Sequence, residues 1–174
     1  MLVYLLRHGI AVEWDAIGVT SDAERALTAE GWERLRLEAA GMRALKLKFD
    51  LILTSPLRRA RETAQAVAEA YGPELKTIVL DALAFGSGFR GGADERSPIF
   101  AQLGAHSFES ALLVGHQPDL GKLASALLTG GFNLNIDFKK GALCAISAVR
   151  PAPHPHNELL WLMAPRQLRL LGQA

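Results

Sequence analysis

The chain has 174 residues, a length typical of one domain with one hydrophobic core. Its 19 Lys and Arg nearly balance 18 Asp and Glu, and the formal charge of +1 argues against a protein that binds nucleic acid. The single cysteine, Cys144, lies in an apolar stretch, which excludes an internal disulfide and indicates a reducing compartment. No segment approaches the ~18 apolar residues of a membrane span, so we expect no membrane partner and a cytoplasmic location.

Short apolar runs alternate along the chain with longer segments of helical period, which is typical of a layered α/β fold. We predict strands over residues 2–6, 50–55, 76–80 and 108–115, and helices over residues 28–46, 56–72 and 118–130. The last two strands, 141–149 and 158–163, are separated by a connection too short for a crossover helix, so they are expected to be antiparallel. The sequence therefore predicts one domain over residues 1–174. We expect a three-layer α/β/α sandwich whose central sheet is mostly parallel, with an antiparallel strand near the edge.

Basic or titratable side chains follow three of the predicted strands. The first strand ends in "LLRHG" with Arg7 and His8, and the fourth ends in "VGHQP" with His116. Ligands of open α/β sheets bind outside the carboxyl ends of the strands. We therefore expect these side chains to meet at one edge of the sheet, with Gly9 allowing the backbone to turn after His8.

The second strand runs into "TSPLRRARETA", where Ser55 is the predicted helix cap. Arginines in the first turn oppose the helix dipole by ~0.3 to 1 kcal/mol each, and a bound anion would remove that conflict. An arginine also offers a bidentate fork to phosphate oxygens. We place Arg58 in this anion site, and Arg59 and Arg61 on the solvated surface. Arg7, His8, Arg58 and His116 would then form a cationic pocket for a phosphoryl group or another oxyanion.

These three motifs, in this order, resemble those of the histidine phosphatase superfamily, the phosphoglycerate mutase-like proteins with an RHG motif. The segments "SDAERALTAEG" and "LLWLMAPRQL" resemble the small SixA-like phosphohistidine phosphatases within it. The resemblance implies that His8 is the nucleophile and that Arg7, Arg58 and His116 surround the phosphate, with Gly9 beside them. It also implies that neither a metal nor another cofactor is required. Arg25 could line the pocket wall, although a surface position is favoured.

The proton donor is not evident from the sequence. Ester-cleaving members of the family carry a glutamate shortly before an "FG"-like pair, and in "ALAFG" (82–86) Ala82 takes that place. Asp81, Glu13 and Asp94 are the remaining candidates. The departure favours a phosphoramidate substrate, because a phosphohistidine ring can already carry the proton that makes it a good leaving group.

Two further patterns are interpreted as loops. The segment "GSGFRG" (86–91) satisfies a dinucleotide-binding pattern, but it neither follows a strand directly nor opens a long helix. We interpret the Gly86–Gly92 loop as a segment beside the pocket mouth. The "HPH" of residues 154–156 lacks further ligands nearby and is interpreted as a turn rather than a metal site.

The sequence thus favours a metal-independent phosphatase that hydrolyses phosphohistidine on a protein substrate through a phospho-His8 intermediate. Two alternatives stay open. One is a small-molecule phosphomonoesterase of the same superfamily, and the other is a phosphate-recognition module without catalytic turnover.

Overall fold

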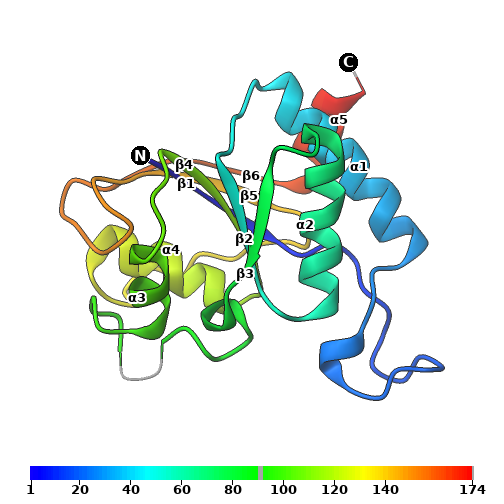
Figure 1. The fold of residues 1–174 in the computed structure, drawn as a ribbon, viewed down its shortest axis with the longest axis horizontal. Helices are drawn as coiled ribbons and strands as arrows, with labels where there is room; N and C mark the ends of the chain where they lie inside the picture. Colours follow the sequence, from blue (N-terminus) through cyan, green and yellow to red (C-terminus); the bar gives the residue numbers. More distant parts are fainter. Residues whose placement is uncertain (90–91, 174) are drawn as a thin grey trace.

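The structure is a computed structural model in which residues 1–89 and 92–173 are described. Within these residues, strands form one sheet in the order β3-β2-β4-β1-β5-β6 (Figure 1). Their bounds are Leu2–Arg7 (β1), Leu51–Thr54 (β2), Lys76–Val79 (β3), Ser110–Gly115 (β4), Leu143–Ser147 (β5) and Glu158–Met163 (β6). Each lies within or close to a strand that the sequence predicts.

The sheet is mostly parallel, as predicted. β1 pairs in parallel with β4, β4 with β2, and β2 with β3. β5 runs antiparallel between β1 and the edge strand β6, because the short segment after β5 can only reverse the chain. The antiparallel strand near the edge is therefore confirmed.

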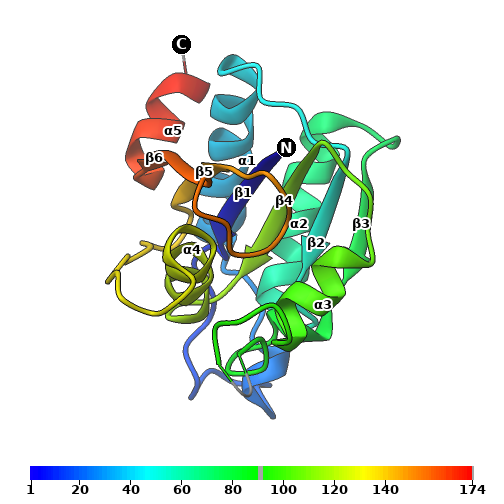
Figure 2. The same ribbon diagram turned by 90° about the vertical axis from the view of Figure 1, so that its left-hand side faces the viewer.

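Helices cover both faces of this sheet. α1 (Ala29–Ala44), α2 (Arg58–Tyr71) and α5 (Pro165–Gly172) lie on one face, and α3 (Pro98–Gly104) and α4 (Asp119–Thr129) lie on the other (Figures 1 and 2). The sequence predicts α1, α2 and α4. It misses the short helices α3 and α5, and also two 3₁₀ turns, η1 (Asp22–Glu24) and η2 (Asp81–Leu83).

The hydrophobic core is split by the sheet into two layers, because neighbouring strand residues point to opposite faces. On β1, Val3 and Leu5 pack on the side of α3 and α4, while Tyr4 and Leu6 pack on the side of α1, α2 and α5. β4 is buried over its full length at the centre of the sheet. The three-layer sandwich is confirmed.

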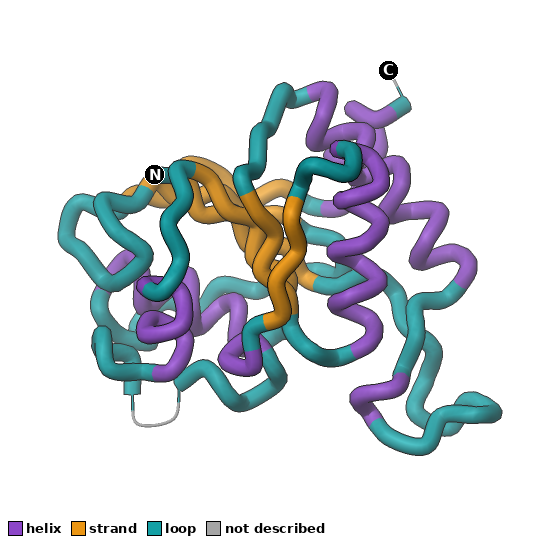
Figure 3. Tube along the Cα trace, in the orientation of Figure 1, coloured by secondary structure: helices purple, strands orange, loops and turns teal. Residues whose placement is uncertain are grey.

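The carboxyl ends of β1, β2 and β4 lie at the same edge of the sheet because these strands are parallel. The loops that leave this edge are drawn in teal in Figure 3. In the described part of the chain no helix combines the length and the hydropathy needed to span a membrane.

Candidate active site

His8 is held in place by its neighbours on both sides of the chain. Its N–H donates to the carbonyl of Gly115 at 3.1 Å, which extends the pairing of β1 and β4 by one residue. The next N–H, that of Gly9, donates to Thr63 Oγ1 on α2, also at 3.1 Å. His8 is thereby fixed between the end of β4 and the first turns of α2, and its side chain is buried.

Gly9 is needed for space rather than for a turn. From the sequence, Gly9 is expected to allow the backbone to turn after His8. Its φ angle is not positive, so its backbone conformation does not require glycine. A Cβ atom on Gly9 would lie 2.6 Å from Leu35 Cδ1 of α1, closer than side-chain carbons approach. The Gly9 carbonyl accepts a 2.8 Å hydrogen bond from His8 Nδ1. Because a carbonyl only accepts, this bond places the proton on Nδ1 and leaves Nε2 with a free electron pair.

The arginine beside His8 is Arg59 and not Arg58. α2 begins at Arg58, two residues later than predicted, with Leu57 rather than Ser55 as its cap. Arg58 is about half exposed and forms an ion pair with Glu62 one turn later. Arg59 is buried, and its Nε donates to His8 Nε2 at 3.3 Å. The predicted position of Arg58 in the phosphate pocket is therefore wrong, and so is the surface position of Arg59.

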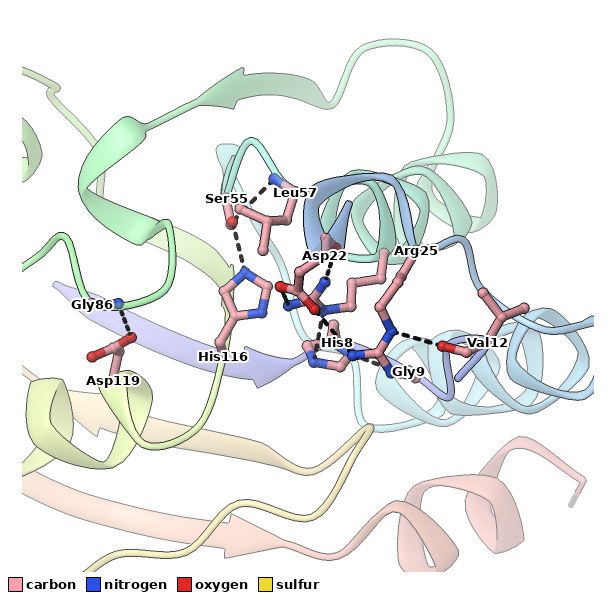
Figure 4. A network of polar contacts seen from close by, with 11 residues as sticks. His8, Gly9, Val12, Asp22, Arg25, Ser55, Leu57, Gly86, His116 and Asp119 are labelled. Atoms are coloured by element: carbon pink, nitrogen blue, oxygen red, sulfur yellow. Dashed lines mark hydrogen bonds and ion pairs between the residues drawn. The ribbon is translucent and has the colours of Figure 1, made fainter. Parts of the chain in front are cut away.

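Asp22 of η1 fixes the orientation of Arg59. The Arg59 guanidinium donates to the Asp22 backbone carbonyl at 2.7 Å and to its Oδ2 at 2.9 Å. Asp22 Oδ1 accepts from Arg25 at 3.1 Å, and Arg25 Nε donates to the carbonyl of Val12 at 2.8 Å. Figure 4 shows this network on one side of His8. Arg25 is thus part of the pocket wall and not a solvated surface residue.

His116 follows β4 directly and is almost fully buried. Its Nε2 shares a 2.7 Å hydrogen bond with Ser55 Oγ, and Nδ1 has no protein partner among the described residues. The centroid of its ring lies 5.1 Å from that of His8. In Figure 4 the nitrogen that is free of Ser55 points towards the side where His8 and Asp22 lie.

These side chains line one pocket of about 390 Å³ at the carboxyl edge of the sheet. The described residues that line it are Arg7, His8, Asp22, Arg25, Arg59, Phe85, His116, Gln117 and Lys140. Cations dominate this wall, and Asp22 is its single carboxylate among the described residues. Such an arrangement can hold a tetrahedral anion against an unprotonated imidazole nitrogen.

Comparison with known proteins identifies the family. A family model for the histidine phosphatase superfamily (branch 1) matches residues 3–84. A protein of Picosynechococcus sp., named only as uncharacterized, is 36% identical over 171 residues, which cover 97% of this chain and 99% of that protein. The chain belongs to the histidine phosphatase superfamily.

Other relatives indicate where in the superfamily the chain lies. The phosphohistidine phosphatase SixA of Escherichia coli (strain K12) is 26% identical over 170 residues, which cover 98% of each chain. A structure of the protein histidine phosphatase SixA complexed with tungstate matches with a TM-score of 0.76 and 27% identity, covering 97% of this chain and 99% of that one. The SixA-like resemblance and the phosphoglycerate mutase-like fold are both confirmed.

Both imidazoles that line the pocket are neutral at physiological pH. Burial is the main cause that lowers the pKa of His8 to about 3, and the neighbouring His116, Arg59 and Arg7 act in the same direction, against the hydrogen bond to Gly9. Burial also lowers the pKa of His116 to about 3, with Arg59 contributing. A neutral His8 is the form that can attack phosphorus.

None of the three proton-donor candidates lines the pocket. Asp81 borders a separate hollow with Ala82 and Gln102, Asp94 pairs with Arg96, and Glu13 is exposed. Asp22 is present, but it is a poor proton donor. Burial raises its pKa, yet the hydrogen bonds from Arg59 and Arg25 outweigh that effect and hold the pKa below its usual value.

The motif of residues 86–91 and the histidines of residues 154–156 are both interpreted from the sequence as loop segments. Gly86 and Gly88 lie in turns after η2, whereas Arg90 and Gly91 of the same motif lie outside the described residues. His154 and His156 lie between β5 and β6. In residues 1–89 and 92–173, no group of three or more His, Cys, Asp or Glu gathers as a metal site would.

Sequence reasoning missed Arg59, Asp22, Phe85, Gln117 and Lys140. A signal for Arg59 was available in α2. Arg58 lies on the same helix face as Glu62, Gln65 and Glu69, which are all polar. Arg59 lies on the same face as Thr63 and Ala66, which are buried. No local signal marks Asp22 or Lys140, because the fold brings them to the pocket from distant loops.

Proposed function

We propose that this protein hydrolyses phosphohistidine on a protein substrate through a phospho-His8 intermediate, without a metal ion. The observation that carries the proposal is the state of His8. Its Nδ1–H donates a hydrogen bond to the Gly9 carbonyl. Its unprotonated Nε2 is on the side of a pocket lined by Arg7, Arg25 and Arg59. A nucleophile whose other nitrogen holds its proton needs no separate base.

The reaction has two displacement steps. His8 Nε2 attacks phosphorus, the bond from phosphorus to the substrate imidazole breaks, and its electron pair returns to the substrate ring nitrogen. Water then attacks phosphorus of phospho-His8, the bond from phosphorus to Nε2 breaks with its electron pair returning to Nε2, and the oxygen and both protons of the water leave in dihydrogen phosphate. The proton stays on Nδ1, hydrogen-bonded to the Gly9 carbonyl throughout, so His8 ends in the state in which it began.

The cations act on the transferring group. We expect Arg7 and Arg59 to contact the phosphoryl oxygens, with His116 hydrogen-bonding to them through Nδ1, the nitrogen that has no protein partner among the described residues. These preorganised side chains would stabilise the negative charge on the phosphoryl oxygens in the transition state. Asp22 keeps Arg59 and Arg25 oriented, as its hydrogen bonds to both side chains indicate.

Two observations favour phosphohistidine over a phosphoester. An alkoxide leaving group needs a proton, whereas the acid candidates lie away from the pocket and Asp22 is held ionised by two arginines. A protonated phosphohistidine ring leaves as neutral imidazole and needs no donor. The similarity to SixA, whose name states phosphohistidine phosphatase, supports the same substrate class.

A cytoplasmic location is consistent with the buried single cysteine, Cys144.

The test compares two substrates side by side in the presence of EDTA. Wild type and His8→Ala are offered a protein phosphorylated on histidine and p-nitrophenyl phosphate, and phosphate release is measured. We expect wild type to prefer phosphohistidine and His8→Ala to lose turnover by about 10³-fold or more.

Each other outcome contradicts part of the proposal. Preference for the ester would favour the small-molecule phosphomonoesterase, and tight phosphate binding without turnover would favour the recognition module. Loss of activity on adding EDTA would contradict the metal-free mechanism. Equal activity of wild type and His8→Ala would contradict the role of His8.

A further inference from the structure

Phe85 stands apart from the rest of the pocket wall. It is the one apolar side chain among the described residues that line this pocket, and 59% of it is exposed. The cationic side chains around it suit a phosphoryl group, for which an aromatic ring offers nothing. A large apolar side chain left open to water at a binding site is available to a ligand, because covering it removes apolar surface from water.

The loop that carries Phe85 is fixed to the fold at several points. The Gly86 N–H donates to Asp119 Oδ2 in the first turn of α4 at 2.7 Å. The Ser87 N–H donates to the Ala84 carbonyl, and the Ile99 N–H to that of Gly88. Gly86 has a φ of +72°, which favours glycine at this position. Figure 4 shows the bond from Gly86 to Asp119 beyond His116, away from Asp22 and Arg25. The exposure of Phe85 is therefore built into the turn.

We infer that Phe85 is the specificity-determining residue for the leaving group, and that its ring stacks on the imidazole of the substrate phosphohistidine. This inference rests on the proposed function and names the part of the site that recognises the leaving group. Asp119 acts through the loop as a positioning residue, because its carboxylate holds the turn that presents Phe85.

The aromatic face suits this leaving group for two reasons. An imidazole bonded directly to phosphorus is a flat ring within reach of the pocket wall, and offset stacking of two rings is favourable. The reactive form of the substrate ring also carries a positive charge, which an aromatic face attracts and an aliphatic side chain does not. As the bond to phosphorus breaks, the electron pair goes to the ring nitrogen and the ring departs as neutral imidazole. Phe85 would thus favour the protonated ring in a pocket whose one carboxylate among the described residues, Asp22, is a poor proton donor.

The experiment measures kcat/KM for two substrates that share the P–N bond, a phosphohistidine peptide and phosphoramidate, which has no ring. The quantity compared is kcat/KM for the phosphohistidine peptide divided by kcat/KM for phosphoramidate. We expect Phe85→Ala and Phe85→Leu to lower this ratio by about five- to tenfold. Phe85→Tyr keeps the aromatic face and is expected to keep the ratio near that of wild type. Leu160→Ala is the control, because it removes a comparably exposed apolar side chain from β6 at the far edge of the sheet.

Asp119 is tested with the same ratio. Asp119→Ala removes the acceptor of the Gly86 N–H and is expected to lower the ratio, by less than Phe85→Ala does. Asp119→Asn keeps an oxygen acceptor for the Gly86 N–H and is expected to keep the ratio near that of wild type. A purely structural defect would instead lower activity on both substrates and leave the ratio unchanged.

The outcomes separate the two proposals. If wild type hydrolyses the phosphohistidine peptide while Phe85→Ala and Phe85→Leu leave the ratio unchanged, the role of Phe85 is overturned and the proposed function stands. An equal loss on both substrates also overturns it. If wild type does not hydrolyse phosphohistidine, the proposed function fails and the role of Phe85 fails with it.

Discussion

Two pairs of histidines in this protein have nearly the same geometry. The rings of His8 and His116 lie 5.1 Å apart with planes inclined by 52°, and those of His154 and His156 lie 5.4 Å apart with planes inclined by 50°. The first pair is buried between two strand ends, whereas the second lies in the loop between β5 and β6, where His156 is exposed. Among the residues that the structure describes, the first pair shares a pocket with Arg7, Arg25 and Arg59, and the pocket that His154 borders contains no arginine.

The comparison teaches that closeness of two imidazoles does not make a reactive site. His154 and His156 are neighbours because they are two residues apart, and the His156 N–H donates to His154 Nδ1 within the loop. His8 and His116 meet only because β1 and β4 pair in parallel. Burial and the surrounding arginines then lower the pKa values of both rings to about 3. Burial together with these neighbours keeps the pKa of His8 far below neutral pH, so its Nε2 carries a free electron pair there.

The largest effect is expected when the arginine that faces the buried pair is removed. Arg59→Ala takes away the guanidinium that donates to His8 Nε2, which makes the buried pair more like the loop pair. We expect kcat/KM for phosphohistidine to fall by about 10²-fold or more, because a preorganised cation at the phosphoryl oxygens is lost. Arg59→Lys keeps the charge without the fork and should recover only part of the loss.

Arg58→Ala is the matched control for Arg59→Ala. The two residues are adjacent and carry the same charge, but Arg58 is paired with Glu62 on the exposed face of α2. Its activity should stay close to that of wild type. A large loss in Arg58→Ala together with a small loss in Arg59→Ala would reverse the assignment.

The second expected effect concerns the pH dependence of stability. The folded-state pKa values of His8 and His116 lie near 3, below the unfolded value of about 6.5. The unfolded chain therefore binds these protons first, and their contribution to stability is present above pH 6.5 and is lost as the pH falls towards 3. We expect the free energy of unfolding to decrease across this window by on the order of 5 kcal/mol per group.

His116→Asn removes one of the two groups and should make that decrease shallower in urea titrations between pH 6.5 and 4. The slope is the quantity to compare, because the substitution also changes stability by a constant amount at all pH values. His154→Asn is the control from the loop pair. An unchanged slope in His116→Asn would contradict the neutral state that we assign to the buried pair.

Most of the fold could be predicted from the sequence, because its signals are local. Apolar runs at strands such as residues 2–6 and 108–115, and the too-short connection after residue 149, determine the sheet and its antiparallel strand. α3 and α5 were missed because each is only two turns long and opens at a proline that reads as an interruption.

The candidate site could be predicted only in part. Arg7 ends β1, and His8 and His116 directly follow β1 and β4, so the sheet itself brings them together. The choice between Arg58 and Arg59 depends on which face of α2 is buried in the fold, and Arg59 lies on that face. Asp22 comes from η1 and Lys140 from the turn before β5, whose positions depend on tertiary packing, and no periodicity in the sequence encodes them.

The central claim is that His8 itself takes the phosphoryl group. It is tested most directly by rapid quench in alkali with a protein carrying ³²P-phosphohistidine, followed by peptide mapping of this enzyme. The account predicts a transient label on the peptide that contains His8, present in wild type and His156→Ala and absent in His8→Ala. Turnover without any label on the enzyme, or a label that persists in His8→Ala, would contradict it.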